Sequence, residues 1–227
     1  DGTDAESLLK RVDIARQDAM QLSGRLQVYQ EGRDSAYRRQ VELIRDLRHV
    51  HQQGGLLLHY QPKLDLRSNR VLQAEALLRW EHPQYGMVSP GEFIPLAERT
   101  GSISLLTGWV ISEGVRQLAE WSGRGIHLQV SLNISADDLI NLDLRDRVEQ
   151  LLEQYRVDPQ QLVFEITESA VMQDQSRSLQ VLEDLRRLGI GLSVDDFGTG
   201  YSSLSQLKRM PVQELKIDQS FVRDLDE

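Results

Sequence analysis

The chain has 227 residues, 40% hydrophobic and 27% charged, with a formal net charge of −9 at pH 7. This length suits one large α/β domain, and the acidic balance argues against a nucleic-acid groove, which normally carries a basic patch. The absence of cysteine excludes disulfides and thiolate-bound metal sites. No apolar run approaches the roughly 18 residues of a membrane span. We therefore expect a cytoplasmic protein, and tethering of a longer parent protein to the inner membrane stays open.

The N-terminal residues are predicted to form a segment separate from the main domain. Apolar residues at helical spacing indicate a helix over residues 6–20, and a short strand is expected at 25–30. A polar turn follows, and a second helix is predicted over 36–53, ended by two glycines. The predicted division is therefore between residues 1–35 and residues 36–227.

Beyond these glycines, strand-like and helix-like patterns alternate, which favours a mostly parallel sheet. The first two strands are joined by a turn-like cluster that indicates an antiparallel hairpin. In chain order we predict strands at 56–66 and 71–80, a helix at 103–121, a strand at 126–133, a helix at 136–155, a strand at 162–167, a helix at 175–188, a strand at 190–195, a helix at 203–209 and a strand at 214–218.

Each of five strands ends in a polar group on the face opposite its apolar residues, because successive strand residues point to opposite faces. The groups are Glu75 with Arg79, Asn133, Glu165 with Glu168, Asp195 with Asp196, and Lys216. The pattern predicts an α/β fold, a TIM-like (β/α) barrel with an antiparallel first strand and its site at the carboxyl ends of the strands. About six strands are predicted where a closed barrel has eight. We therefore expect the natural protein to continue for roughly fifty residues, or another chain to complete the barrel.

Converging carboxylates, an amide and a lysine are typical of a metal-assisted phosphoryl site. An oxygen-only ligand set without a strand-end histidine favours Mg²⁺ or Mn²⁺ over zinc, and such cations would let an acidic site accept a phosphate ester. Each group also has a structural alternative. Glu75 could pair with a helix, Asn133 and Glu165 could cap or hydrogen-bond, Asp195-Asp196 could form a plain turn, and Lys216 could be a surface lysine.

Several motifs follow one another from about residue 56 onward. They are Tyr60-Gln61-Pro62, Glu75-Ala76-Leu77-Leu78-Arg79-Trp80, Pro90-Gly91-Glu92-Phe93-Ile94-Pro95-Leu96-Ala97-Glu98, Asn133-Ile134-Ser135, Glu165-Ile166-Thr167-Glu168, Asp195-Asp196-Phe197-Gly198-Thr199-Gly200-Tyr201-Ser202-Ser203 and Lys216-Ile217-Asp218. In this order they resemble the motifs of EAL domains, the bacterial phosphodiesterases of the messenger cyclic di-GMP.

The resemblance implies a role for each matching position. Metal ligands would be Glu75, Asn133, Glu165, Asp195 and, for a second ion, Asp196. Lys216 would serve catalysis beside the attacking water, and Glu168 by steadying the loop after Asp196. Substrate would contact Gln61, Leu78, Arg79, Pro90 and Asp218. The implied reaction is hydrolysis of one phosphodiester of cyclic di-GMP to linear pGpG at a site with two Mg²⁺ or Mn²⁺ ions.

Two departures from the family pattern bear on activity. A later Glu-Gly-Val-Glu motif, which holds a further metal ligand in the family, does not occur up to Glu227, and this leaves open whether the chain is active even where a longer parent protein is. Residues 8–29 resemble the end of a GGDEF domain, with Met20 where lysine is usual. The family also implies a homodimer and a preceding GGDEF-like or sensory domain. A cyclic di-GMP receptor without catalysis, or a protein scaffold with a vestigial pocket, are the alternatives to an enzyme.

Overall fold

A computed structural model describes residues 5–21, 28–29, 33–198 and 210–221. The chain divides into two compact units, residues 1–50 and residues 51–227. The predicted division at residue 35 falls inside helix α2 (Arg33–Leu47) of the first unit, and it stays a prediction.

The first unit contains helix α1 (Ala5–Gln21) and helix α2. The two helices are joined by a hydrogen bond from the Tyr37 hydroxyl to Asp13 Oδ2, 2.8 Å long, and Asp13 also accepts from Arg16. The second predicted helix is broken at residues 48–49, and helix α3 (Val50–Gln53) follows the break. The strand expected at 25–30 is not found at residues 28 and 29, and its other residues lie outside the described ranges.

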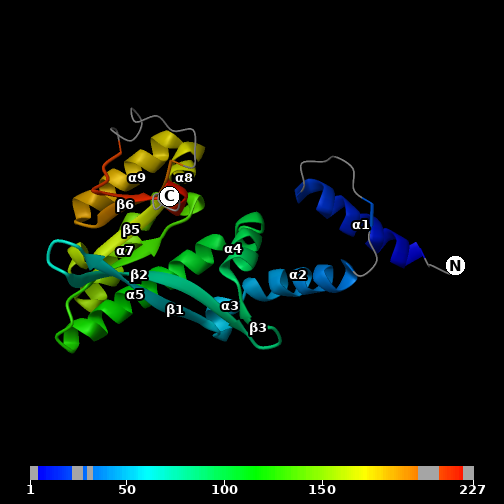
Figure 1. The fold of residues 1–227 in the computed structure, drawn as a ribbon, viewed down its shortest axis with the longest axis horizontal. Helices are drawn as coiled ribbons and strands as arrows, with labels where there is room; N and C mark the ends of the chain where they lie inside the picture. Colours follow the sequence, from blue (N-terminus) through cyan, green and yellow to red (C-terminus); the bar gives the residue numbers. More distant parts are fainter. Residues whose placement is uncertain (1–4, 22–27, 30–32, 199–209, 222–227) are drawn as a thin grey trace, which may run out of the picture. The chain divides into compact units, whose positions relative to one another are not determined.

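The second unit is built on one sheet of seven described strands (Figure 1). Its order is β1-β2-β4-β5-β6-β7, with β3 paired to β2. Strand β2 pairs antiparallel with β1 and with β3. The pairs β2–β4, β4–β5, β5–β6 and β6–β7 are parallel. The strands are β1 (Leu56–Asp65), β2 (Arg70–His82), β3 (Gly86–Val88), β4 (Gln129–Asn133), β5 (Leu162–Thr167), β6 (Gly191–Phe197) and β7 (Glu214–Ile217). The predicted parallel sheet with an antiparallel first strand is confirmed.

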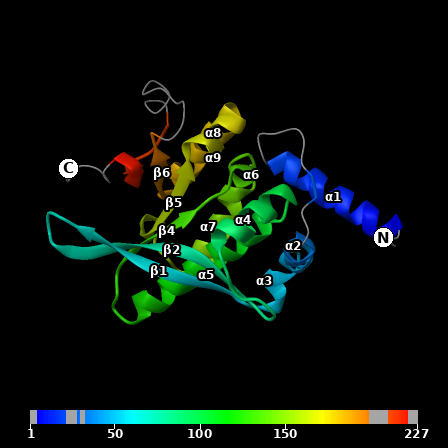
Figure 2. The same ribbon diagram turned by 45° about the vertical axis from the view of Figure 1, so that its right-hand side comes forward.

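The sheet curls strongly along this order without closing among the described strands. β1 and β7 are its two ends, yet Lys63 Nζ of β1 lies 3.3 Å from Glu214 Oε1 of β7. Such curvature is that of a barrel wall. The hairpin of β1 and β2 forms a long ribbon, and β4 pairs only with residues 73–76 of it (Figure 2). At the hairpin turn, Asp65 Oδ1 accepts hydrogen bonds from the backbone N–H groups of Arg67 and Ser68.

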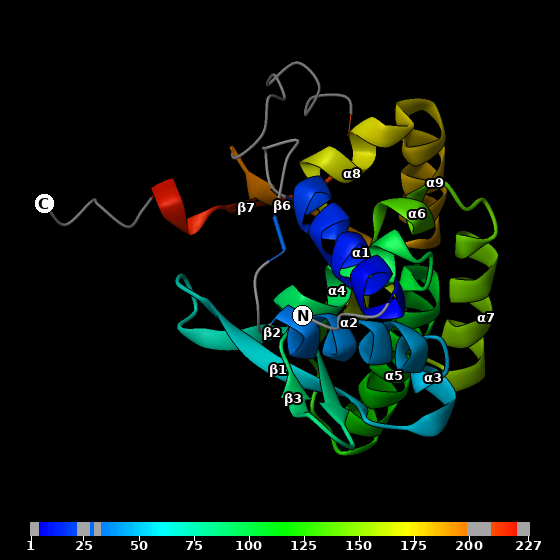
Figure 3. The ribbon, with the colours of Figure 1, turned by 90° about the vertical axis from the view of Figure 1, so that its right-hand side faces the viewer.

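Three helices cover one face of the sheet side by side (Figure 3). They are α5 (Ile103–Gly123), α7 (Leu144–Tyr155) and α9 (Gln175–Leu188). The core lies between them and the apolar sides of the strands, where Leu132, Phe164 and Val194 are fully buried. Each such side chain contributes about 1.5–3 kcal/mol through burial. The apolar sides of the strands therefore face the helices, which leaves the polar sides inside the curl.

Shorter helices lie beside the carboxyl ends of the strands. They are α4 (Pro90–Arg99), α6 (Ala136–Leu139) and α8 (Glu168–Gln173). The helix predicted at 136–155 is therefore wrong as one element. Asn141 Oδ1 accepts from the backbone N–H of Asp143 between α6 and α7, and this local turn competes with helix continuation. The helix predicted at 203–209 lies outside the described residues. Two 3-10 turns, η1 (Pro159–Gln161) and η2 (Gln219–Phe221), complete the unit.

Among the described residues, no helix combines the length and the apolar character needed to cross a membrane.

Candidate functional site

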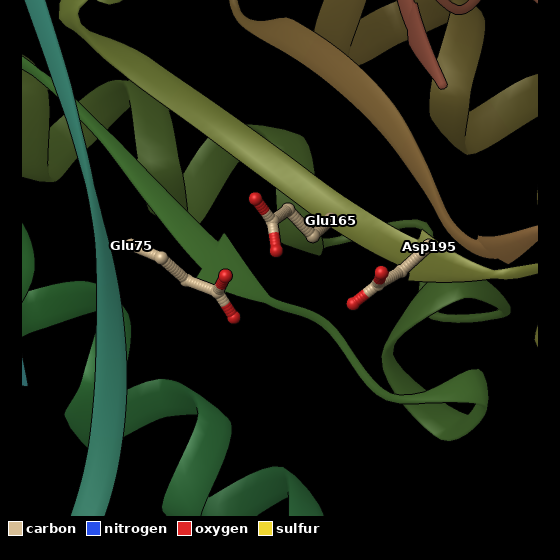
Figure 4. Close-up of side chains that lie close together, drawn as sticks. All are labelled: Glu75, Glu165 and Asp195. Carbon is tan, nitrogen blue, oxygen red and sulfur yellow. The ribbon is translucent and has the colours of Figure 1, made fainter. Parts of the chain in front are cut away.

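Three carboxylates from three strands converge at the carboxyl edge of the sheet. Glu75 of β2, Glu165 of β5 and Asp195 of β6 each offer an oxygen, and these oxygens lie within 4.8 Å of one another. Figure 4 shows the three side chains pointing toward one another. Asn133 of β4 joins them, because its Nδ2 donates a 3.2 Å hydrogen bond to Glu75 Oε1. The predicted convergence of these four residues is what the geometry shows.

Lys216 of β7 lies at the centre of this group. Its ammonium donates to Glu75 Oε2 at 3.0 Å, Glu165 Oε2 at 2.6 Å and Asp195 Oδ2 at 2.9 Å. Burial alone would lower the pKa of Lys216, but the hydrogen bonds to Glu165, Asp195 and Glu75 outweigh burial and raise it. The lysine is therefore charged and offsets part of the repulsion among the acids.

A second lysine, absent from the sequence prediction, contacts the same cluster. Lys63 of β1 donates to Glu165 Oε1 at 2.6 Å, so the buried Glu165 carboxylate accepts from Lys216 on one oxygen and from Lys63 on the other. Burial raises the pKa of Glu165, and the two lysines outweigh this and lower it. Strand alternation places Lys63 on the face of Gln61, and that signal was available. Its contact with Glu165 also depends on how strongly the sheet is curved between β1 and β5, and no local sequence pattern predicts that curvature.

Asp196 follows Asp195 near the end of β6, where the pairing of this strand with β7 is irregular. Its backbone has φ 53°, in the left-handed region, and its N–H donates to Asp195 Oδ1 at 2.9 Å. Burial and the charges of Asp195 and Asp218 raise the pKa of Asp196. Gly198 follows the strand with φ 99°, and a Cβ there would lie 2.5 Å from the exposed Phe221 ring. The left-handed φ favours glycine at this position, directly after the two acids.

Glu168 lies buried at the start of α8, with Thr167 as the helix N-cap. Its Oε1 has no hydrogen-bond partner among the described residues. The loop that it is expected to steady falls largely at residues 199–209, outside the described ranges. Its predicted role therefore stays a prediction.

The predicted substrate contacts divide into two groups. Leu78, Arg79 and Pro90 line one cavity of about 650 Å³, which Asn133 also borders. The apolar residues Ile94, Ile103, Leu106 and Val110 also line the cavity. Gln61 pairs with Glu75 across β1 and β2, and Asp218 follows β7 near Asp196. Neither Gln61 nor Asp218 lines this cavity.

The donor set fits a hard divalent cation. It offers carboxylate oxygens from several strands with an adjacent amide, the ligands that Mg²⁺ and Mn²⁺ take. Burial, and after it the charges of Asp195 and Asp218, raise the pKa of Asp196, and a cation would relieve the repulsion among these acids. Glu75, Asn133, Glu165 and Asp195 could hold one ion, and Asp196 could serve a second.

Comparison with known proteins places this geometry in one family. The EAL domain family model matches residues 44–227. The chain is 45% identical over 187 residues to the bifunctional diguanylate cyclase/cyclic di-GMP phosphodiesterase MucR of Pseudomonas aeruginosa, covering 82% of this chain and 27% of that protein. It is 36% identical over 225 residues to the cyclic di-GMP phosphodiesterase PdeR of Escherichia coli, covering 99% and 34%. The chain thus spans about a third or less of the length of these relatives.

Solved structures agree with the sequence comparison. The PaMucR phosphodiesterase in complex with c-di-GMP has a TM-score of 0.76 at 44% identity, over 82% of this chain and 76% of that one. The FimX EAL domain of Pseudomonas aeruginosa bound to c-di-GMP has a TM-score of 0.75 at 28% identity, over 82% and 75%.

Proposed function

Because the chain belongs to the EAL domain family, we propose that it hydrolyses cyclic di-GMP with the help of divalent metal ions. Relatives named as cyclic di-GMP phosphodiesterases support the substrate and the reaction type. The expected product is linear pGpG. Water adds across one P–O bond, with its hydroxyl joining phosphorus and its proton going to the leaving oxygen.

One observation carries this proposal. Glu75, Glu165 and Asp195 bring oxygens within 4.8 Å of one another from three separate strands, and Lys216 contacts all three. Gathering acids in this way costs free energy through desolvation and like-charge repulsion. A purely structural core would use apolar side chains at these positions, whereas metal-assisted phosphoryl chemistry needs the acids there.

The residues take distinct roles in the proposed reaction. Glu75, Asn133, Glu165 and Asp195 would hold one Mg²⁺ or Mn²⁺ ion, and Asp196 would serve a second. When bound, the ions would supply Lewis-acid stabilisation of the phosphodiester oxygens and lower the pKa of an attacking water.

Other groups would act on the dinucleotide and the water. The Lys216 ammonium, within 3.0 Å of each carboxylate, is placed to orient the water or to stabilise phosphate charge. Arg79 borders the cavity with Leu78 and Pro90, and its guanidinium is suited to grip a phosphate. Gln61 and Asp218 are proposed as further contacts. Glu168 is proposed to steady the loop that follows Asp196.

The test is hydrolysis of cyclic di-GMP by the 227-residue chain with Mn²⁺ or Mg²⁺, followed by separation of pGpG. We expect metal-dependent product in the wild type, and a rate below about one-hundredth of it in Glu75→Ala, which removes a ligand. Glu81→Ala is the matched control, because Glu81 lies exposed on the same strand. Equal loss in both variants would contradict the assigned role of Glu75. Binding of cyclic di-GMP without turnover, both by this chain and by a longer protein that carries the Glu-Gly-Val-Glu motif, would favour the receptor alternative.

We propose a homodimer and a preceding GGDEF-like or sensory domain in a longer protein, in line with a chain that covers 27–34% of its relatives. A cytoplasmic location with a cyclic di-GMP signalling role is proposed with them.

A further inference from the structure

Lys63 makes three hydrogen bonds inside the curl of the sheet. Its ammonium donates to Glu165 Oε1 at 2.6 Å, to Ser131 Oγ at 3.0 Å and to Glu214 Oε1 at 3.3 Å. An ammonium has three protons to donate, so its donors are all used. The lysine is therefore held in one position from three directions.

Two of these partners, Ser131 and Glu214, lie in a row one step below the candidate metal ligands, whereas Glu165 is itself one of those ligands. Ser131 precedes Asn133 by two residues on β4, and Glu214 precedes Lys216 by two on β7. Residues two apart on a strand share a face. Lys63 belongs to the same row, because it pairs with Gln73, two residues before Glu75 on β2. The row supports the ligand layer without belonging to it.

Lys63 and Lys216 each donate a hydrogen bond to a different oxygen of the Glu165 carboxylate. Lys63 binds Oε1, and Lys216 binds Oε2, the oxygen on the side of Glu75 and Asp195. Glu165 is completely buried. With one oxygen fixed by Lys63, the carboxylate cannot rotate without breaking a short, charged hydrogen bond.

We propose that Lys63 is a positioning residue for Glu165, fixing one carboxylate oxygen so that the other faces the divalent ion. This inference rests on the proposed function. Lys63 touches neither ion nor substrate in this role. It orients the metal ligand Glu165 by a hydrogen bond to the oxygen that does not face the ion, as hydrogen-bond partners of metal ligands generally do. Loss of such a partner lowers metal affinity or activity by about 10–100-fold.

A positioning role of Lys63 and a simple effect of its charge predict opposite changes in cation affinity when the lysine is removed. Removing a positive charge beside a cation site would by itself tighten cation binding, because like charges repel. Loss of the contact that positions the Glu165 carboxylate would instead weaken cation binding. The sign of the change in Mn²⁺ affinity therefore reports which effect dominates.

The experiment measures Mn²⁺ binding by calorimetry in the wild type, Lys63→Met and Lys63→Arg, all as the 227-residue chain. We expect Lys63→Met to raise the Kd for Mn²⁺ about tenfold and to lower kcat about 10–100-fold, with the KM for cyclic di-GMP within about twofold. Lys63→Arg keeps the charge and donors, so it should recover most of the affinity. Arg70→Met is the matched control, because it removes a positive charge from an exposed position in the same hairpin.

An unchanged or lower Kd in Lys63→Met, with the protein folded by circular dichroism, would overturn the positioning role. If Lys63→Met does not fold, the same measurements on Lys63→Gln decide the question by the same criterion. Should the wild type itself bind no Mn²⁺, the proposed function fails instead. The two failures are thus distinguishable.

Discussion

Lys216 lies where the carboxylates of Glu75, Glu165 and Asp195 converge, and each of them accepts one of its hydrogen bonds. A divalent ion held by the same oxygens must compete with this ammonium for them. The lysine therefore stabilises the acids and at the same time lowers their affinity for a metal. Two unit charges about 4 Å apart interact by about 4 kcal/mol at an effective dielectric of 20, so even a fraction of this competition is measurable.

We predict that Lys216→Met binds Mn²⁺ more tightly than the wild type, by about tenfold, which corresponds to about 1.4 kcal/mol. Hydrolysis of cyclic di-GMP should nevertheless be lost, because the proposed orienting group is gone. Calorimetric titration with Mn²⁺ gives the affinity, and product separation gives the rate. The expected change in affinity is opposite in sign to that of Lys63→Met. Weaker Mn²⁺ binding in Lys216→Met would show that the lysine and the ion do not compete.

At the scale of the elements, helix α5 packs closely against strand β4. Gly114 of α5 faces the fully buried Leu132, and a Cβ on Gly114 would lie 3.0 Å from both Leu132 methyl carbons. That distance is shorter than ordinary van der Waals contact. The absence of a side chain at Gly114 thus sets how near the helix comes to the sheet.

We predict that Gly114→Ala destabilises the fold by about 1 kcal/mol, since overpacking costs about 1–3 kcal/mol and outweighs the helix propensity gained from alanine. Urea unfolding followed by circular dichroism measures the change. Gly123→Ala is the matched control at the end of the same helix, where a new Cβ would meet no atom within 4 Å. It should leave the free energy of unfolding unchanged or raise it by up to about 1 kcal/mol. Equal stability of the two variants would contradict the packing argument.

Most strands were predictable, whereas the three-residue strand β3 and several helices were not, for physical reasons. The strand at 162–167 was predicted with the bounds of β5, because a short, mostly apolar run with β-branched residues and polar flanks is typical of a buried strand. Helix α8 was missed, since Thr167 ends β5 and caps the helix directly, leaving no loop to signal a change. Helix α4 was missed although Pro90 at its start is a known signal. Its internal Pro95 obscures the helical pattern.

For the molecule as a whole, the candidate site was predictable because parallel strands deliver their carboxyl ends to one edge. The strand pattern of the sequence alone therefore predicts that Glu75, Asn133, Glu165, Asp195 and Lys216 lie close together. Lys63 could not be assigned to the site in this way, because its contact with Glu165 depends on how far the sheet curls between β1 and β5. Curvature arises from twist summed over many strands, and no short motif encodes it.

The unpaired edge of β7 favours association of this chain with a second copy of itself. Among the described residues β7 pairs only with β6, and Ile217 on it is 62% exposed. Unpaired edges and exposed apolar side chains favour pairing with another chain. We predict that the 227-residue chain self-associates at about 100 μM and that Ile217→Lys reduces the apparent mass in light scattering. Leu142→Lys, at a position 50% exposed outside any strand, should leave it unchanged. A wild-type chain that stays monomeric at this concentration would show that the edge is protected.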